Sequence, residues 1–234
     1  LVEDFSIRFL PSAGVLPLLE GARREAGTGA VHAFAPFPDE LPASRSEARR
    51  ARVAGQRPVV SMGARATERR VRAALSSGHT VHLATHGILN ARNPMFSRIA
   101  LARNGGGPTD DGRLDVHELL SLDVRSPLVF LSGCDTGVGN SWSTSYAIGE
   151  DYSTLAQAFL FAGAENVIAT LWAIEDQGAD EFAGHFYDAL GAASPVQAVA
   201  AAQRAMLADD RFSAPYYWAG YQLAGSGGWS AGAQ

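Results

Sequence analysis

Short apolar runs alternate with amphipathic helical patterns along most of the chain. Continuous apolar runs at Pro127–Leu131 and Asn166–Leu171 are typical of strands that are buried on both faces. Apolar residues at helical spacing predict three long helices, over Ser153–Gly163, Asp176–Leu190 and Ser194–Asp209, the last with Pro195 in its first turn. Strands that alternate with helices in this way predict an α/β fold with a mainly parallel central sheet.

The remaining segments carry weaker patterns. Strands are expected at Ala30–Phe34, Pro58–Met62, Thr80–Thr85 and Tyr217–Leu223, and a hairpin at Arg98–Ala102 with Gly112–Leu114. Helices are expected at Val15–Arg24 and Ser46–Val53, from the N-cap Thr67 through Leu75, and at Val116–Ser121 after the cap Asp115. Small and polar residues predict a loop at Gly137–Tyr146 and a flexible tail at Gly225–Gln234.

Composition narrows the class of protein. The 234 residues are 47% hydrophobic and 18% charged, with a net charge of −5, which is typical of one globular domain over residues 1–234. The single cysteine excludes an internal disulfide and a zinc site built on several cysteines. All 19 basic residues are arginine, which excludes a lysine Schiff base and a P-loop lysine. Asp110, Asp111 and Asp115 lack the spacing of a calcium loop, and we expect neither a metal nor a cofactor.

The ends of the chain and its hydropathy bear on its location. No stretch reaches the roughly 18 continuous apolar residues of a membrane span. The start has no charged segment followed by an apolar one, as a signal peptide would have. These patterns predict a cytoplasmic protein with no membrane contact. Because the chain begins with Leu1 rather than Met, we expect it to be the C-terminal part of a larger protein.

Two residues with catalytic chemistry follow predicted strands. His86-Gly87 comes directly after Thr80–Thr85, and Cys134 follows Pro127–Leu131. Functional residues of open α/β sheets gather beyond the carboxyl ends of the strands, so neighbouring strands would bring His86 and Cys134 within hydrogen-bonding reach. An imidazole that takes the thiol proton creates a thiolate nucleophile. The backbone N–H groups of Gly87 and Cys134 would then form an oxyanion hole.

Each of these assignments has an alternative. Free cysteine is often a small buried residue, and that role for Cys134 stays open beside the nucleophile. His82 competes with His86 as the base because both lie on one face of the strand, although its position inside the strand favours a packed core histidine. The other histidines are expected to be structural or solvated: His32, His79, His117 and His185.

The two motifs resemble those of the CHAT family of caspase-like cysteine peptidases, in the clan of caspases, separases and gingipains. The likeness covers, in chain order, Val81–Gly87, Asn93–Ser97, Ile99–Ala102, Asp111–Leu114, Leu131–Gly137, Leu155–Ala164, Leu171–Asp176 and Tyr216–Ala219. It implies a caspase-like three-layer sandwich, with a mainly parallel sheet between helices, and a dyad of His86 and Cys134. The order and spacing of the two residues agree with caspases. This chain has Ser-Gly-Cys-Asp-Thr-Gly where many relatives have Ser-Ala-Cys-Glu-Thr-Gly.

The resemblance also implies an activity. It indicates a cysteine endopeptidase that cleaves specific protein targets, in a regulated prokaryotic defence or cell-death pathway. Relatives often follow tetratricopeptide repeats or other sensor domains, which implies a regulatory domain or subunit as a partner. Two other functions stay open: a catalytically silent caspase-like interaction module, and an α/β-hydrolase. A hydrolase needs its histidine after the nucleophile, where this chain has only His185, in a predicted helix interior.

Substrate-binding residues are expected near the nucleophile and at the ends of neighbouring strands. Asp135, Glu175 and Asp176 would make this pocket acidic. Arg or Lys before the scissile bond would match it, because a desolvated carboxylate needs a cationic partner. Asp176 has an alternative role as the cap of the following helix. Trp172 is expected either to line the pocket or to pack in the core.

A group of arginines precedes the predicted site: Arg45, Arg49, Arg50, Arg52, Arg57, Arg65, Arg69, Arg70 and Arg72. Such a cluster occurs on nucleic-acid-binding surfaces. No aromatic residue lies between Phe37 and Phe96, however, and no nucleic-acid-binding motif is present. We therefore expect a solvated face or an activation loop, and no direct binding of nucleic acid.

Overall fold

A computed structural model describes residues 1–10, 12, 14, 17, 30–53, 55–90, 92–104, 107, 110–132 and 147–228, without side chains for 147–154. Its main sheet has six strands in the order β2 (Val59–Met62), β1 (Val31–Ala35), β3 (Thr80–Ala84), β7 (Val129–Ser132), β8 (Asn166–Thr170) and β9 (Tyr221–Gly225). All neighbouring pairs are parallel except β8 and β9. The predicted α/β fold with a mainly parallel sheet is therefore confirmed.

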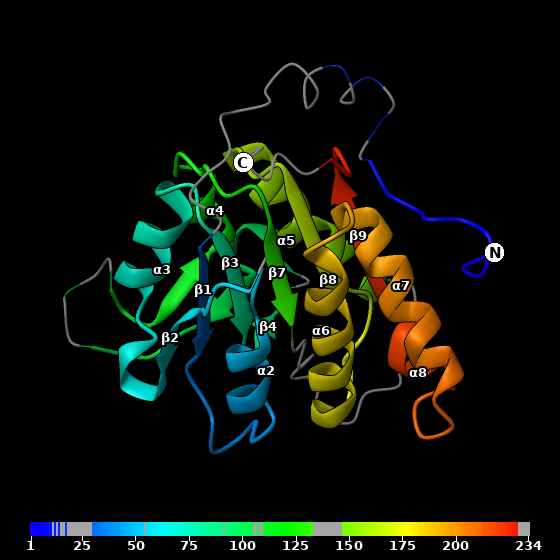
Figure 1. Cartoon of the computed structure of the whole chain (residues 1–234). Helices are drawn as coiled ribbons and strands as arrows, with labels where there is room; N and C mark the ends of the chain where they lie inside the picture. Colours follow the sequence, from blue (N-terminus) through cyan, green and yellow to red (C-terminus); the bar gives the residue numbers. More distant parts are fainter. Residues whose placement is uncertain are drawn as a thin grey trace.

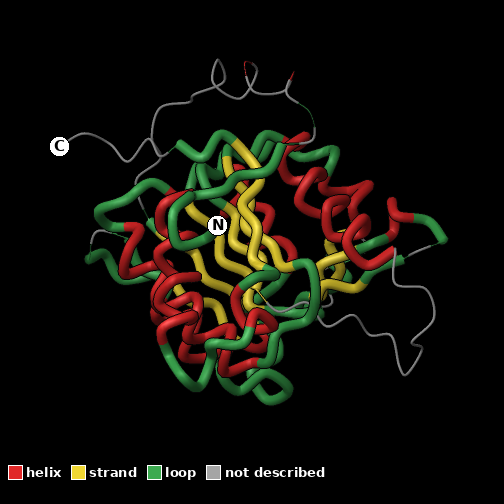
Figure 2. Tube along the Cα trace, turned by 90° about the vertical axis from the view of Figure 1, so that its right-hand side faces the viewer, coloured by secondary structure: helices red, strands yellow, loops and turns green. Residues whose placement is uncertain are grey.

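Helices cover both faces of this sheet. One face packs on α2 (Ser44–Arg50), α6 (Asp176–Leu190) and α7 (Pro195–Ala208). The other packs on α3 (Glu68–Ser76), α4 (Val116–Leu119) and α5 (Ala147–Ala162). Figure 1 shows α2 and α6 in front of the strands, and Figure 2 shows the strands between helices on both sides. This is the three-layer sandwich that the sequence predicts.

The two cores follow from alternation along the central strands. In β3, Val81 and Leu83 face the core on the α3 side, and in β7, Phe130 faces the core on the α6 side. All residues of β3, β7 and β8 are buried. Strands buried on both faces lie between two helix layers, so the continuous apolar runs of β7 and β8 place these two strands, with the neighbouring β3, at the centre of the sheet.

Most predicted boundaries agree with the structure to within a few residues. The helix α6 has the predicted bounds, whereas α5 begins at Ala147 rather than Ser153 and the last strand begins at Tyr221 rather than Tyr217. A short helix, α8 (Pro215–Trp218), takes the start of that predicted strand, with Pro215 in its first turn. The helix expected at Val15–Arg24, apart from Pro17, and the loop at Gly137–Tyr146 lie outside the described residues.

A second, three-stranded antiparallel sheet follows β3 directly. It consists of β4 (Gly87–Ile88), β5 (Arg98–Ala100) and β6 (Arg113–Asp115), so the predicted hairpin is confirmed and β4 is an addition to it. The 3₁₀ helices η2 (Gly63–Arg65) and η3 (Pro94–Phe96) complete this half of the chain. Gly112 before β6 has a φ of 83°, and a Cβ there would lie 2.9 Å from the Leu101 carbonyl oxygen, so glycine is required.

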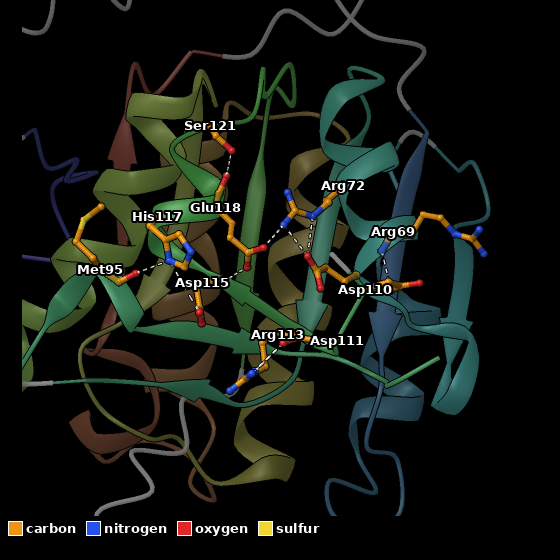
Figure 3. A network of polar contacts seen from close by, with 11 residues as sticks. Arg69, Arg72, Met95, Asp110, Asp111, Arg113, Asp115, His117, Glu118 and Ser121 are labelled. Atoms are coloured by element: carbon orange, nitrogen blue, oxygen red, sulfur yellow. Dashed lines mark hydrogen bonds and ion pairs between the residues drawn. The ribbon is translucent and has the colours of Figure 1, made fainter. Parts of the chain in front are cut away.

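A network of ion pairs ties the small sheet to the main body (Figure 3). Arg72 on α3 donates to Glu68 at 2.7 Å and to Glu118 on α4 at 2.8 Å. Glu118 in turn accepts from the Asp115 N–H at 3.0 Å, where β6 ends. Burial raises the pKa of the Glu68 carboxyl, and Arg72 opposes that rise. Arg72 thus joins α3 to α4 and fixes the position of β6.

Residues near the two ends of the described chain contact β8 and its neighbour, the edge strand β9. The Phe9 N–H donates to the Leu223 carbonyl at 2.8 Å, and the Gly225 N–H donates to the Phe9 carbonyl at 3.2 Å. The Gly227 N–H donates to the Asn166 side chain at 2.8 Å, so the first part of the predicted tail is held on β8, while residues 229–234 lie outside the described ranges. No helix in the described part of the chain is both long and apolar enough to cross a membrane.

Candidate active site at the ends of β3 and β7

The strands β3 and β7 are direct neighbours, as the predicted dyad requires. Their last paired residues are Ala84 and Ser132. The Thr85 N–H also donates to the Ser132 carbonyl at 3.0 Å, so the pairing continues to the end of both strands. His86 and Cys134 each follow this last pair by two residues in the sequence. Cys134 and Asp135 themselves lie outside the described residues.

The backbone of His86 is fixed by the small sheet. The Ala100 N–H donates to the His86 carbonyl at 2.9 Å, and the buried Thr85 hydroxyl donates to the Ala100 carbonyl at 2.7 Å. His86 and Ala100 therefore form a hydrogen-bonded antiparallel pair. Because such pairs alternate with non-hydrogen-bonded ones, the next pair, Gly87 with Ile99, leaves the Gly87 N–H directed away from β5.

Two residues of the loop after β1 contact the His86 side chain. Glu40 Oε2 lies 3.2 Å from His86 Nε2, and the Phe37 ring centroid lies 5.4 Å from that of the imidazole. The His86 side chain is 16% exposed and that of Glu40 is 69% exposed, so the ion pair reaches solvent at its acidic end. A carboxylate at this distance holds the orientation of the ring.

The loop from β1 to α2 is itself held at both ends. The Leu41 N–H donates to the Phe37 carbonyl at 2.9 Å, which closes a turn beneath Glu40. The Ala43 N–H, at the start of α2, donates to Asp176 Oδ2 at 2.6 Å. The carboxylate of Asp176, from the first turn of α6, therefore positions the loop that carries Phe37 and Glu40.

The described pocket candidates lie together after the carboxyl end of β8. Trp172 is partly buried; its Nε1–H donates to the Tyr216 carbonyl at 2.8 Å, and its ring leaves no space for a Cβ on Gly220. Glu175 is exposed and is the N-cap residue of α6, without a capping hydrogen bond from its side chain. Asp176 hydrogen-bonds to α2 instead of capping its own helix.

Burial is the main cause of a raised pKa at the Asp176 carboxyl. The hydrogen bond from the Ala43 N–H opposes this rise, and the negative charges of Glu47, Glu175 and Asp180 add to it. The region between α2 and the start of α6 is therefore acidic and partly shielded from water. A cation placed there would gain more than a neutral group.

The sequence did not predict which polar residues contact the buried histidine of β3. His82 is fully buried, with Nε2 3.2 Å from Glu47 Oε1 and Nδ1 3.0 Å from the Tyr187 hydroxyl. Burial, with the charge of Glu47 as a second cause, raises the pKa of the Tyr187 hydroxyl well above its usual value. His82 is thus the packed core histidine that its position inside β3 favours. The sequence signal for its partner was one acidic residue on the apolar face of a short helix.

The other histidines lie apart from this cluster. His32 stacks on His79 with ring centroids 4.4 Å apart, and burial lowers the pKa of His32, with His79 as a second cause. His117 Nδ1 lies 3.2 Å from the Met95 carbonyl oxygen, beside the ion-pair network of Figure 3. His185 lies in the interior of α6, as predicted, which is no position for the base of an α/β-hydrolase. Among the described residues, no three His, Cys, Asp or Glu side chains are arranged to hold a metal ion.

Comparison with known proteins identifies relatives of this fold. The sequence model of the CHAT domain matches residues 1–226. Saccharomyces cerevisiae separase, in its complex with securin, superimposes with a TM-score of 0.62 at 16% identity, over 95% of this chain and 14% of the separase chain. Gingipain R, an Arg-specific cysteine proteinase, superimposes with a TM-score of 0.51 at 14% identity, over 84% of this chain and 46% of that chain. No curated protein sequence matches the chain.

The two structural relatives share the caspase-like fold of cysteine peptidases. The chain spans about a seventh of the separase chain and less than half of the gingipain chain. It therefore corresponds to a part of each of these larger chains, and the likeness establishes the fold alone.

Proposed function

The chain belongs to the CHAT domain family, and from this we propose that it is a cysteine endopeptidase that cleaves specific protein targets with a dyad of His86 and Cys134. One observation carries the proposal. The paired strands β3 and β7 end in register at Ala84 and Ser132, and the two reactive residues each follow two positions later. In this proposal, the separation of 48 residues in the sequence becomes proximity at the carboxyl ends of the two strands.

The proposed reaction is acyl transfer through a thioester. The His86 imidazole takes the thiol proton of Cys134, and the thiolate attacks the carbonyl carbon of the scissile peptide bond. The carbon–nitrogen bond then breaks, and the imidazolium gives its proton to the leaving amine. His86 next removes a proton from water, which attacks the thioester and releases the acid product and the free thiol.

Two backbone N–H groups would stabilise the negative oxygen that develops in this reaction. The Gly87 N–H is directed away from β5, and Gly87 directly follows the base. A second donor is the Cys134 N–H, whose residue follows the end of β7. Donors fixed by a sheet need no reorganisation when the charge appears, which is the basis of oxyanion stabilisation.

Glu40 and Phe37 serve the dyad as positioning residues. The Glu40 carboxylate stabilises the imidazolium that forms during the reaction and fixes the ring rotation, as the third member of a triad does. Phe37 limits the ring from its side. Neither residue touches the substrate in this proposal.

We place the pocket for the substrate residue before the scissile bond beside Trp172, Glu175, Asp176 and Asp135. The carboxylates make the pocket acidic, so the peptidase would prefer Arg or Lys at that position. Of the two described carboxylates in this pocket, the exposed one of Glu175 is more accessible to a substrate, because the Asp176 carboxylate already accepts the Ala43 N–H. A peptide library varied at this position tests the preference: cleavage after Asp or a large apolar residue contradicts an acidic pocket.

The biological setting follows from the family. We propose a cytoplasmic peptidase of a prokaryotic defence or cell-death pathway, controlled by a sensor or regulatory domain or subunit such as tetratricopeptide repeats. Separase, a structural relative, was solved in complex with securin, so a structural relative provides a precedent for a protein partner. Direct binding of nucleic acid is not part of this proposal.

The lone cysteine permits a test of the dyad without a known substrate. We expect iodoacetamide to alkylate Cys134 about tenfold faster in the wild type than in His86→Ala, because the imidazole raises the thiolate fraction. The matched control is His117→Ala, which removes a surface histidine outside the proposed site and leaves the rate unchanged. Equal rates in all three proteins contradict the dyad.

The activity itself is tested with substrate proteins. Candidate targets, encoded by neighbouring genes, are incubated with wild type, Cys134→Ala and His86→Ala, each together with the proposed regulatory domain or subunit. We expect cleavage by the wild type alone. Equal cleavage by Cys134→Ala excludes the peptidase mechanism. Rapid alkylation without cleavage of any target, with the regulatory domain or subunit supplied, supports the silent interaction module instead.

A further inference from the structure

The strand β2 is an open edge of the main sheet. It pairs with β1 on one side, and no described strand pairs with its other side. The opposite edge, β9, is covered instead, because the backbone of Phe9 makes two hydrogen bonds with it. Unpaired N–H and C=O groups along an edge are a template for the addition of a further strand.

The sequence of β2 has few of the devices that block such addition. Its four residues, Val-Val-Ser-Met, contain no charge and no proline, and the Val59 side chain is 52% exposed. Pro58 directly precedes the strand and lacks an N–H, so pairing would begin at Val59. The edge is therefore short but competent to bind an extended chain.

Arginines surround this edge. Arg57 precedes β2, Arg65 follows it in η2, and Arg69 and Arg70 begin α3; all four are exposed. None of their guanidinium groups has a carboxylate within 4.0 Å among the described residues. In Figure 3 the Arg69 side chain extends away from Asp110 and the rest of the network.

The positive charge is only partly balanced locally: Asp110 accepts from the Arg69 N–H at 3.2 Å but is buried. Between Gln56 and Arg72 the sequence has one acidic residue, Glu68, which is fully buried and paired with Arg72. A positive field beside an open strand edge selects the partner by charge: it attracts an acidic segment and repels a basic one.

We propose that the outer edge of β2 binds an extended, acidic segment of a partner protein by strand addition. The backbone of β2 would supply the hydrogen bonds, and the exposed arginines at its two ends would supply the preference for negative charge. A second copy of this chain is a poor occupant, because it would bring the same arginines to the contact. A nucleic acid lacks the peptide backbone that the edge would pair with, and no aromatic residue lies between Phe37 and Phe96 for bases to stack on.

This surface is separate from the proposed active site. Within the sheet, β1 lies between β2 and β3, and none of the residues placed in the dyad belongs to β2. The proposal therefore does not depend on peptidase activity, and each can fail without the other.

The test uses a labelled peptide of alternating glutamate and valine, blocked at both ends, as the probe. Its binding to the whole protein is measured by fluorescence anisotropy. The first control has proline in place of valine, which keeps the charge but prevents strand pairing. The second has lysine in place of glutamate. We expect the glutamate–valine peptide to bind about tenfold tighter than either control, and its affinity to fall as salt is raised.

Protein variants locate the contact. The double variant Arg57→Glu with Arg65→Glu is expected to weaken binding of the probe about tenfold. A matched control, Arg92→Glu with Arg125→Glu, changes the net charge equally at exposed arginines away from β2, and should leave the affinity unchanged. Hydrogen exchange of the Val59–Met62 amides should slow when the probe is added.

Several results would overturn the proposal. One is equal binding of the proline control, which would make the contact electrostatic without strand addition. Another is the absence of binding by the probe. A third is protection of the β2 amides that rises with protein concentration alone, which would make a second copy the occupant. Tighter binding of an RNA oligonucleotide than of the probe, lost in the Arg57→Glu with Arg65→Glu variant, would make a nucleic acid the ligand and contradict the proposal.

Discussion

At the scale of single residues, the candidate site depends on contacts that hold a histidine rather than on the histidine alone. The position of His86 and Cys134 at the ends of two predicted strands made both residues candidates, and the resemblance to the CHAT family favoured them over His82 and a buried cysteine. Glu40 and Phe37 were not predicted, because the contact with His86 joins segments 46 residues apart through a loop without regular pattern. A loop conformation of that kind is set by anchors such as the Ala43–Asp176 hydrogen bond, and such anchors leave no periodic signal.

Replacement of Glu40 by glutamine tests its positioning role. We expect kcat on a cleaved substrate to fall about tenfold with KM nearly unchanged, because the lost charge stabilises the imidazolium of the transition state and does not bind substrate. Glu40→Asp should recover part of the rate. Asp39→Asn is the matched control, since Asp39 lies in the same loop but pairs with Arg45. A change in KM alone would contradict the assignment.

The buried contact between His82 and Glu47 gives a second prediction at this scale. His82→Leu should lower the free energy of unfolding by about 1–3 kcal/mol, because the buried Glu47 carboxyl and the Tyr187 hydroxyl both lose their contact with the ring. Adding Glu47→Leu to this variant should restore most of the loss. Urea denaturation measures both values, and a double variant no more stable than the single one would show that the pair stabilises the fold by itself.

At the scale of elements, α2 and α6 illustrate what a pattern predicts and what it omits. The amphipathic spacing of α6 predicted both of its ends: eight of its residues are buried, and six of these belong to one hydrophobic core. The short helix α2 begins two residues and ends three residues earlier than predicted, since its position depends on α6: Arg50 pairs with Asp180 at 3.3 Å and with Glu181 at 3.2 Å. Likewise, the aromatic residues Tyr216–Trp218 favour a strand locally, and Pro215 with tertiary packing makes them helical.

Gly184 on α6 lets Arg50 cross the helix, because a Cβ there would overlap the guanidinium. We therefore expect Gly184→Ala to destabilise the protein by about 1–2 kcal/mol, as the displaced Arg50 loses both partners. In an Arg50→Ala background the same change should stabilise by about 0.5–1 kcal/mol, because alanine favours the helix. A double-mutant cycle on denaturation midpoints measures this coupling, and equal effects in both backgrounds would refute the contact.

At the scale of the whole molecule, the layered architecture was predictable from the sequence, whereas the order of the outer strands and the coverage of the sheet edges were not. Burial of β3, β7 and β8 on both faces follows from their composition. The order of the outer strands depends on connections and on the coverage of β9 by Phe9, a contact between positions 214 residues apart that no local pattern indicates.

Removal of residues 1–10 tests that coverage. Loss of the two hydrogen bonds at Phe9 should lower Tm by about 4–8 °C, because each bond contributes roughly 1 kcal/mol and each kcal/mol shifts Tm by about 2–4 °C at this chain length. The exposed edge of β9 should also promote association, visible by analytical ultracentrifugation. Removal of residues 229–234 is the control of similar size that keeps Phe9 on β9. An unchanged Tm and a monomer at all concentrations would contradict a protective role.

The contact between Phe9 and Leu223 also has a consequence for biosynthesis. A ribosome that adds about 5–20 residues per second needs roughly 10–40 s to travel between these two positions. During that time β9 has not been synthesised. Once β8 has been made, it is itself an exposed edge, and residues 1–10 have no β9 to pair with. The nascent chain therefore passes through a stage in which its N-terminal segment is complete but unpaired, because β9 has not yet been made. For this domain, chaperone protection during translation matters most over that interval.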